Sequence, residues 1–374
     1  MTSHDTAGPL SADNTPAAVG GTDLTNPASL LARAVLHLHE GNPAEAERCY
    51  DACIVADPDG AVAWGGKARC RLAVADYASA TEFAVAALAR AIDAPEYGRL
   101  LMETAARAGD LELLGLAAKR QVRLFPEERD AVAFRQLVPE TLLTPADEDG
   151  DALEAIEHVL RTVRDRRPRR YGQLLQCLLA RRPRSILEIG VFDGRNGADM
   201  IHAGGRTPAG TRALRYIGFD LFEEMTAEVH KKEFSKYPLS RLEVGAALSA
   251  FNDNHLLVQG YTQDSLKAFG AAWDGAVSPV DFVFIDGGHS EETIESDWNN
   301  VAPLMSERTV VIFDDCYLDK VAALDGLGCN SLVGRLAEDP RYLVEYLPIR
   351  DCFEKEFGTL TIVVVKVRLR PSFI

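Results

Sequence analysis

Three aspartates and one histidine are the residues of this chain whose types and spacing could do chemistry. Asp286 ends one apolar run and His289 follows three residues later, while Asp314 and Asp315 end a second apolar run. Such runs are typical of buried strands in a parallel sheet, where neighbouring strands lie about 4.8 Å apart. We therefore expect the three carboxylates to converge at the carboxyl edge of a sheet, where open α/β folds bind ligands.

Three converging carboxylates repel one another unless a cation or a proton compensates them. Carboxylate oxygens are ligands that Mg²⁺ prefers, with water and substrate oxygens completing its shell. The pattern therefore predicts a magnesium site formed by Asp286, Asp314 and Asp315. The alternative is a carboxylate that stays neutral or caps a helix.

His289 lies in the loop directly above this expected edge. A histidine titrates near neutral pH and can remove a proton from a hydroxyl whose pKa a metal has lowered. We predict that His289 and Asp286 are catalytic. The alternative is that His289 caps the helix that follows it, or only orients Asp286.

A glycine-rich turn forms the second candidate site. An apolar segment at 186–189 leads into Gly190, Gly194 and Gly197, and a helical pattern follows. Strand, glycine turn and helix make the opening unit of a doubly wound nucleotide site. The spacing differs from the dinucleotide pattern G-x-G-x-x-G, which disfavours a nicotinamide oxidoreductase. Taken alone, the motif also fits an ordinary strand-to-helix turn.

A further acid, Asp220, ends the next expected strand, where it could accept hydrogen bonds from ribose hydroxyls. Glu223 and Glu224 follow it closely and leave this assignment open. The segment 204–211 is predicted to be an inserted loop. Two apolar strands at 342–347 and 360–367 are expected to form a final antiparallel hairpin.

The motif Glu188-x-Gly190-x-x-x-Gly194 resembles the first motif of class I S-adenosylmethionine (SAM) methyltransferases. The segments 284–290 and 312–315, with Asp297 between them, resemble the small-molecule O-methyltransferases grouped with macrocin O-methyltransferase and the cephalosporin-pathway methyltransferase. The resemblance covers about 180–367. It implies a Rossmann-like α/β sheet of seven strands with an antiparallel last strand.

The resemblance also implies a set of SAM contacts, with Tyr171 near one wall of the site. The residues expected to bind SAM are Glu188, Gly190, Gly194, Asp220, Thr262, Asp264 and Asp286. In members that hold a metal, its ligands match Asp286, Asp314 and Asp315. For the segment after strand three, the alternative is a helix start capped by Asp264 or Ser265.

The amino-terminal part has a different pattern. Residues 1–26 are rich in small and polar residues and are expected to be disordered. From Pro27, a period of 34 places small or turn-forming residues at 41–42, 75–76 and 109–110, which resembles tetratricopeptide (TPR) repeats. An unrelated antiparallel helical bundle is the alternative. The predicted domains are therefore a TPR-like region at 27–140 and a methyltransferase domain at 152–374.

The net charge of −16 disfavours non-specific binding to nucleic acid or to anionic membranes. The basic run 161–170 is interpreted as a solvated helix face or a connector. No segment has the length and apolarity of a membrane span, and the seven scattered cysteines suggest reduced thiols in the cytoplasm.

Together these features predict a SAM-dependent, Mg²⁺-assisted O-methyltransferase acting on a hydroxylated small metabolite in natural product biosynthesis. One alternative is a protein-bound or carrier-bound acceptor recruited by the TPR-like region. Another is an inactive methyltransferase domain in a TPR scaffold. The repeats could also mediate a homo-oligomer or contact a protein partner.

Overall fold

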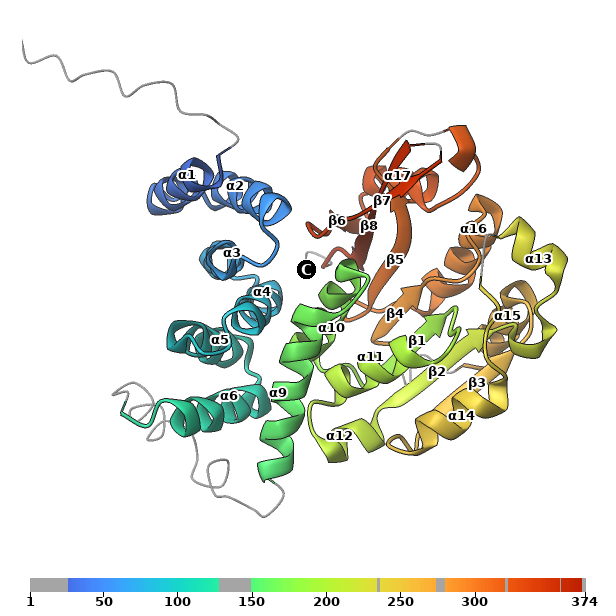
Figure 1. The fold of residues 1–374 in the computed structure, drawn as a ribbon, viewed down its shortest axis with the longest axis horizontal. Coiled ribbons are helices and arrows are strands. Elements are labelled where there is room, and N and C mark those ends of the chain that lie inside the picture. Colours follow the sequence, from blue (N-terminus) through green and yellow to red (C-terminus); the bar gives the residue numbers. More distant parts are fainter. Residues whose placement is uncertain are drawn as a thin grey trace, which may run out of the picture.

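The computed structural model describes residues 26–127, 149–233, 236–273, 280–319, 322–356 and 358–371. An array of helices packs against a mixed α/β sheet (Figure 1). The segment 1–25 and most of the expected link between the two predicted domains lie outside the described residues. Among the residues described, no helix is both long and apolar enough to cross a membrane.

Within the described residues, the amino-terminal array consists of three helical hairpins. Its helices are α1 (Pro27–His39), α2 (Pro43–Ala56), α3 (Ala61–Ala73), α4 (Tyr77–Arg90), α5 (Pro95–Ala108) and α6 (Leu111–Leu124). Each hairpin turns through one residue with positive φ, at Gly41 (78°), Ala75 (58°) and Gly109 (73°). These are the turn positions that the 34-residue period predicts, so the expected helical hairpins are present.

The sheet has the strand order β3-β2-β1-β4-β5-β8-β6. Its strands are β1 (Ser185–Ile189), β2 (Arg215–Asp220), β3 (His255–Gln259), β4 (Phe282–Ile285), β5 (Val310–Tyr317), β6 (Tyr342–Tyr346), β7 (Asp351–Lys355) and β8 (Gly358–Leu369). Strands β1 to β5 run parallel, and β8 pairs antiparallel with β5 and β6. The predicted sheet with antiparallel final strands is confirmed.

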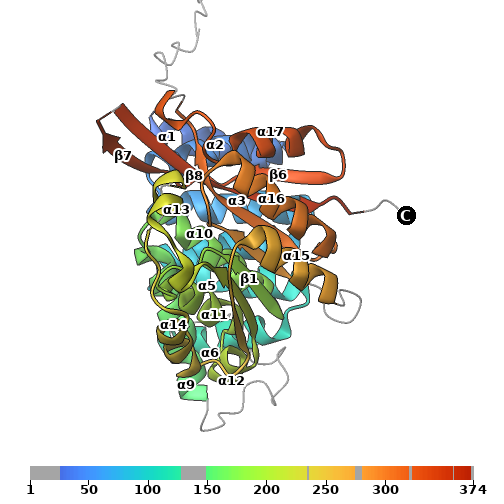
Figure 2. The same cartoon turned by 90° about the vertical axis from the view of Figure 1, so that its right-hand side faces the viewer.

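An additional strand, β7, pairs antiparallel with β8, so the sheet has eight strands and not seven. The sequence suggested only a connection here because β7 is mostly exposed and lacks the apolar alternation of its neighbours. The β7–β8 hairpin projects beyond the rest of the sheet (Figure 2).

Helices cover both faces of the sheet. The helices of this part are α9 (Asp149–Asp165), α10 (Gly172–Arg181), α11 (Arg195–Gly205), α12 (Pro208–Ala213), α13 (Ala227–Lys232), α14 (Arg241–Ser249), α15 (Thr262–Ala272), α16 (Glu291–Val301) and α17 (Asn330–Glu338). Alternate residues of each central strand join different cores, as Phe284 packs with α10 and α11 and Ile285 with α15 to α17. The predicted loop 204–211 is wrong, because it contains the end of α11 and the start of α12.

A buried group of charges joins the helical array to the sheet. Lys366 on β8 is 1% exposed, and its Nζ lies 2.9 Å from Glu82 Oε2 on α4 and 2.8 Å from Glu345 Oε2 on β6. Arg181 on α10 also binds Glu82, with Nε 2.5 Å from Oε1. Two positive and two negative charges therefore balance where α4 meets the sheet, and the array is integral to this fold.

We predict that Lys366→Ala destabilises the whole chain, because it leaves Glu82 and Glu345 without their shared cation in a buried place. Breaking a buried ion pair in this way costs about 3–5 kcal/mol. The exposed pair Arg335–Glu295 provides the matched control, for which Arg335→Ala should cost less than about 1 kcal/mol. Urea unfolding measures both, and equal losses in the two variants would contradict a structural role for this junction.

Candidate active site

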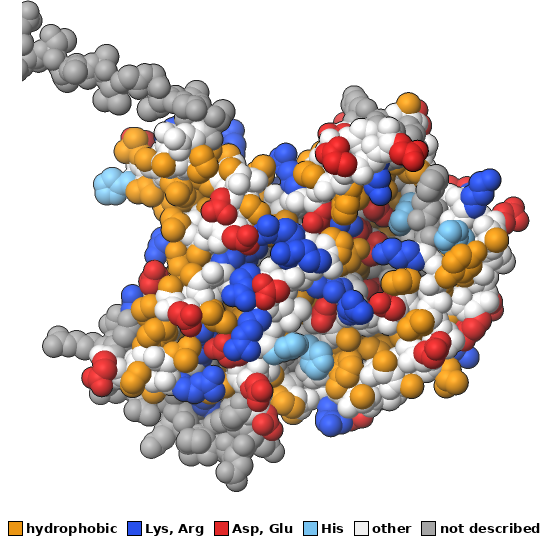
Figure 3. Space-filling view, in the orientation of Figure 1, with side chains coloured by type: hydrophobic (Ala, Val, Ile, Leu, Met, Phe, Trp, Pro, Cys, Tyr) orange, Lys and Arg blue, Asp and Glu red, His pale blue; other side chains and the backbone are white. Residues whose placement is uncertain are grey.

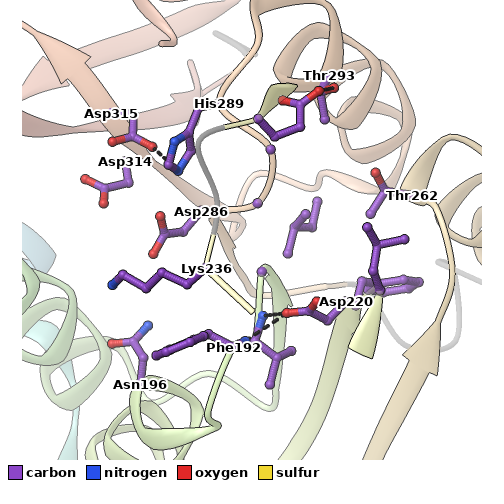
Figure 4. A pocket seen from close by; sticks show the side chains of 18 of the residues that line it. Phe192, Asn196, Asp220, Lys236, Thr262, Asp286, His289, Thr293, Asp314 and Asp315 are labelled. Atoms are coloured by element: carbon purple, nitrogen blue, oxygen red, sulfur yellow. Dashed lines mark hydrogen bonds and ion pairs between the residues drawn. The ribbon is translucent and has the colours of Figure 1, made fainter. Parts of the chain in front are cut away.

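A cavity of about 550 Å³ opens at the carboxyl edge of the parallel strands. Its described lining residues all fall between Arg166 and Phe353, so the described helices α1 to α6 do not line it. Figure 4 shows the side chains that project into it from the ends of β1, β2, β4 and β5 and from the loops between them. The site therefore lies where the sequence predicts it, at the edge where the parallel strands end.

The glycine turn is shaped by close contact between two strand ends. Gly190 has φ 92°, and a Cβ there would lie 2.0 Å from the backbone oxygen of Asp286. Gly190 lines the cavity, whereas Gly194 stands at the N-terminal end of α11, where a Cβ would lie 2.8 Å from Val244 Cγ1. Gly190 is therefore placed for a ligand contact, and Gly194 for packing against α14.

Glu188 lies behind this turn and does not reach the cavity. It is fully buried, where it accepts hydrogen bonds from Tyr216 Oη and from Asn196 Nδ2, the latter at 2.9 Å. Burial raises its pKa to about 7, although these two hydrogen bonds favour the charged form. The structure thus places Glu188 where it can position the turn, outside the described lining of the cavity.

Asp220 holds the opposite side of the turn. Its Oδ2 accepts hydrogen bonds from the backbone nitrogens of Val191 and Phe192, both at 2.8 Å. The carboxylate faces the cavity at the end of β2 (Figure 4). Of the expected SAM contacts, Asp220 is therefore placed both to shape the glycine turn and to face a ligand.

The segment after β3 contributes only part of what the sequence predicts. Thr262 lines the cavity, but Asp264 is exposed in the first turn of α15 and is not part of the lining. The expected alternative is also wrong, because the cap position of α15 is Tyr261 and not Asp264 or Ser265.

The three predicted carboxylates do converge, and Tyr171 bridges two of them. Its hydroxyl oxygen lies 2.5 Å from Asp286 Oδ2 and 2.7 Å from Asp314 Oδ2, so its one proton is shared between the two carboxyl groups. Burial and the two neighbouring carboxylates raise the Tyr171 pKa well above 10, so the phenol keeps its proton. Burial, reinforced by Asp314 and Asp315, also raises the pKa of Asp286 well above its usual value.

Arg170 supplies the cation that the sequence did not reveal. Its Nε and Nη2 donate to the two oxygens of Asp314 at 2.6 and 2.7 Å, and its Nη1 donates to Asp351 at 3.1 Å. Although burial opposes ionisation, this guanidinium lowers the pKa of Asp314. The interpretation of the run 161–170 as a solvated face or connector is wrong for Arg170, which is 5% exposed.

His289 lies next to Asp315, with Nε2 3.2 Å from Oδ2 (Figure 4). It does not cap the helix that follows, because the cap of α16 is Ser290, whose side chain accepts from the backbone nitrogen of Thr293. His289 is instead fixed through its backbone oxygen, which accepts a hydrogen bond from Gly328 at 2.8 Å. The imidazole is therefore held in the cavity beside a carboxylate.

A divalent cation fits only part of the predicted ligand set. Asp286, His289 and Asp315 offer ligand atoms that all lie within 4.8 Å of one another. Asp314 is the exception, since Arg170 and Tyr171 already bind both of its oxygens. Asp286 and Asp315 of the predicted set are therefore brought together with His289, whereas Asp314 is bound by the guanidinium of Arg170.

Several cavity residues were not predicted as site residues. Arg170, Lys236, Phe192 and Phe353 all line the cavity. Arg170 carried one usable signal, since it directly precedes Tyr171 at the start of the helix that leads to β1. Lys236 and Phe353 come from segments whose place over the site depends on tertiary packing.

Part of the sheet region matches a known protein family. Residues 187–316 match a family model described as "Methyltransferase domain". The match confirms the expectation of a methyltransferase domain in this part of the chain. No curated protein matches the chain.

Solved structures of several methyltransferases are similar to the chain. An O-methyltransferase from Bacillus cereus bound to SAH is 17% identical, with 63% of this chain and 97% of that one covered and a TM-score of 0.37. An O-methyltransferase of tomaymycin synthesis from Streptomyces achromogenes, in complex with SAM, is also 17% identical. The similarity covers 63% of this chain and 95% of that one, with a TM-score of 0.36. A calicheamicin methyltransferase is 17% identical, with 63% of this chain and 93% of that one covered and a TM-score of 0.36. Because these TM-scores are below 0.5, the fold described above rests on the strand order of this chain.

We predict that Glu188 makes the stability of the chain depend on pH. Its pKa of about 7 in the folded chain exceeds the ordinary value of 4.5, so the folded state holds this proton more tightly than the unfolded state does. The stability that this difference contributes is fully present below about pH 4.5 and is lost as the pH rises through 7. At about 1.4 kcal/mol per pKa unit, the 2.5-unit difference corresponds to a loss of stability of about 3.5 kcal/mol. Between pH 5 and pH 8, the free energy of unfolding measured with urea should fall less in Glu188→Gln than in the wild type.

The exposed variant Glu295→Gln serves as the control and should keep the pH dependence of the wild type. If Glu188→Gln lost as much stability between pH 5 and pH 8 as the wild type does, Glu188 would not be the group that titrates.

Proposed function

We propose that the chain transfers the methyl group of SAM to a hydroxyl of a small metabolite. The observation that carries this proposal is the pairing of His289 with Asp315 in the same cavity as the glycine turn. The turn is suited to hold the methyl donor, and the imidazole is suited to remove the proton of the acceptor. The motif resemblance supports a role in natural product biosynthesis.

The SAM-binding half of the proposal uses Gly190, Asp220 and Thr262, which all line the cavity. Asp220 would accept hydrogen bonds from the ribose hydroxyls, while it also holds the amides of the glycine turn. Glu188 and Gly194 support the turn from behind. Positioning of this kind contributes to the rate because it holds the two reacting atoms in line.

His289 is the proposed base. A neutral His289 that donates its Nε2 proton to Asp315 has its lone pair on Nδ1, which can take the hydroxyl proton of the acceptor. The acceptor oxygen then bonds to the methyl carbon while the carbon–sulfur bond breaks, and that electron pair remains on sulfur. Asp315 stabilises the imidazolium that this transfer leaves.

Mg²⁺ is proposed to bind Asp286 and Asp315, since Mg²⁺ sites commonly use one or two carboxylates together with water and substrate oxygens. When bound, the ion would stabilise the ionised hydroxyl of the acceptor. Asp314 stays with Arg170 in this arrangement, and Tyr171 orients Asp286 through its hydroxyl. His289 remains free to act as the base.

The helical array is proposed to be TPR-like, as its 34-residue period and its three turns with positive φ support. Because no described residue of the array lines the cavity, its proposed role is contact with a second copy or a protein partner, not coverage of the acceptor. Delivery of a protein-bound acceptor therefore remains only the second candidate.

The proposed base is tested with His289→Ala in a screen of hydroxylated metabolites that measures SAH release. We expect turnover to fall by roughly 10²-fold or more, which is the usual contribution of a general base. His39→Ala, an exposed histidine of α1, is the control and should keep normal turnover. Near-normal turnover of His289→Ala at neutral pH would leave His289 without a role in proton transfer.

The metal proposal predicts that EDTA abolishes turnover and that added Mg²⁺ restores it, while SAH binding persists. Asp315→Asn should raise the Mg²⁺ concentration needed for half-maximal turnover by about tenfold or more. Asp314→Asn should leave that concentration unchanged, because Asp314 is bound by Arg170. Full turnover in EDTA, or an equal shift in both variants, would contradict this ligand assignment.

A further inference from the structure

Three basic side chains of the cavity form no ion pair among the residues that the structure describes. The basic residues that line the cavity are Arg166, Arg167, Arg170, Arg195, Lys232 and Lys236. Arg166, Arg170 and Lys232 are each paired with a carboxylate. Arg167, Arg195 and Lys236 are exposed and unpaired, and we call these three residues the basic rim.

Lys236 reaches into the cavity over the glycine turn. Its Nζ lies 5.0 Å from the centre of the Phe192 ring, and the backbone nitrogen of Leu239 donates to the Phe192 oxygen at 3.1 Å. In Figure 4 the side chain extends across the cavity between Asp286 and Asn196. These contacts fix the segment that carries Lys236 against the start of α11.

The other two cations lie on segments that meet at the same place. Arg195 is the first residue of α11. Arg166 donates to Asn196 Oδ1 at 3.4 Å, which brings the turn that carries Arg167 against that first helical turn. Nη1 of Arg167 donates to the backbone oxygens of Asp165 and Arg166, and these two hydrogen bonds leave the other donors of its guanidinium available. Three segments far apart in sequence therefore bring three positive charges to one rim.

Among the described residues, the acids of the cavity form no ion pair with this rim, and several of them accept hydrogen bonds from other groups. Asp220 binds two amides of the turn, Asp193 binds the backbone nitrogen of Arg195, and Glu233 binds Ser290 and Thr293. The described lining contains six acids beside its six basic residues, so the absence of ion pairs, and not a net positive charge, distinguishes the rim. In the space-filling view, Lys and Arg side chains lie among Asp and Glu side chains along the middle of this face (Figure 3).

We propose that the basic rim binds an acidic group of the acceptor, so that the substrate is a hydroxylated molecule bearing phosphate or carboxylate groups. This proposal rests on the proposed methyl transfer. SAM itself brings a single carboxylate, whereas the rim offers three unpaired cations. Two of the cations are arginines, whose planar guanidinium groups bind phosphate and carboxylate oxygens in pairs.

Calorimetry on the full chain saturated with SAH tests this proposal, with inorganic pyrophosphate and citrate as probes in metal-free buffer. We expect saturable binding of at least one probe at a single site. Tighter binding of pyrophosphate would indicate a phosphate-bearing acceptor, and tighter binding of citrate a carboxylate-bearing one. The double variant Arg195→Gln/Lys236→Gln should weaken that binding at least tenfold and change SAH affinity less than threefold.

Arg335→Gln, which removes an exposed charge of α17 away from the cavity, is the control and should bind the probes normally. The proposal is overturned if neither probe binds, or if both bind the double variant as tightly as the wild type. It is also overturned if SAH affinity falls as much as probe affinity, because the rim would then serve the SAM carboxylate. A wild-type chain that fails to bind SAH would instead contradict the proposed methyl transfer, and probe binding to the ligand-free chain would still decide whether the rim is an anion site.

Discussion

The contact on which the site depends is the buried pair between Arg170 and Asp314. Asp286 follows β4, and Asp314 and Asp315 lie near the end of the neighbouring strand β5. Without compensation, the repulsion among these carboxylates would oppose ionisation at all three positions. The guanidinium binds both oxygens of Asp314, and the Tyr171 hydroxyl is shared between Asp314 and Asp286. The acids consequently differ in character, with Asp314 held ionised and the pKa of Asp286 raised.

This pair also explains why the last strands of the sheet matter to the site. Asp351, the first residue of β7, accepts hydrogen bonds from the backbone nitrogens of Arg169 and Arg170 at 2.9 and 3.0 Å, as well as from the Arg170 side chain. The extra strand therefore fixes the turn that carries Arg170. The helical array reaches the same turn through an ion pair between Asp59 and Arg169. The array can thus support the site without lining it.

The sequence predicted the position of the site well because parallel strands end at one edge. Once the runs before Asp286 and Asp314 are assigned to strands, their convergence follows from sheet geometry alone. Gly190 was predicted for a similar reason, since its positive φ and the close approach of Asp286 require a residue without Cβ.

The partners of each side chain could not be predicted in the same way. Strand ends fix a carboxylate to within a few ångströms, but a hydrogen bond requires the correct neighbour within about 3 Å. Glu188 shows this limit, because its motif suggests a ligand contact while burial against Tyr216 removes it from the cavity. Arg170 shows the converse, since a run of arginines resembles a solvated face until tertiary packing buries one of them.

The central claim is that the glycine turn and the acid at the end of β2 form a SAM site. Calorimetry of SAH binding to the purified full chain and to Asp220→Ala tests it most directly, with NAD⁺ as the competing nucleotide. The account predicts one SAH site in the wild type, at least tenfold weaker binding in the variant, and no binding of NAD⁺. Absence of SAH binding to the folded wild-type chain, or binding of NAD⁺ in its place, would contradict the account.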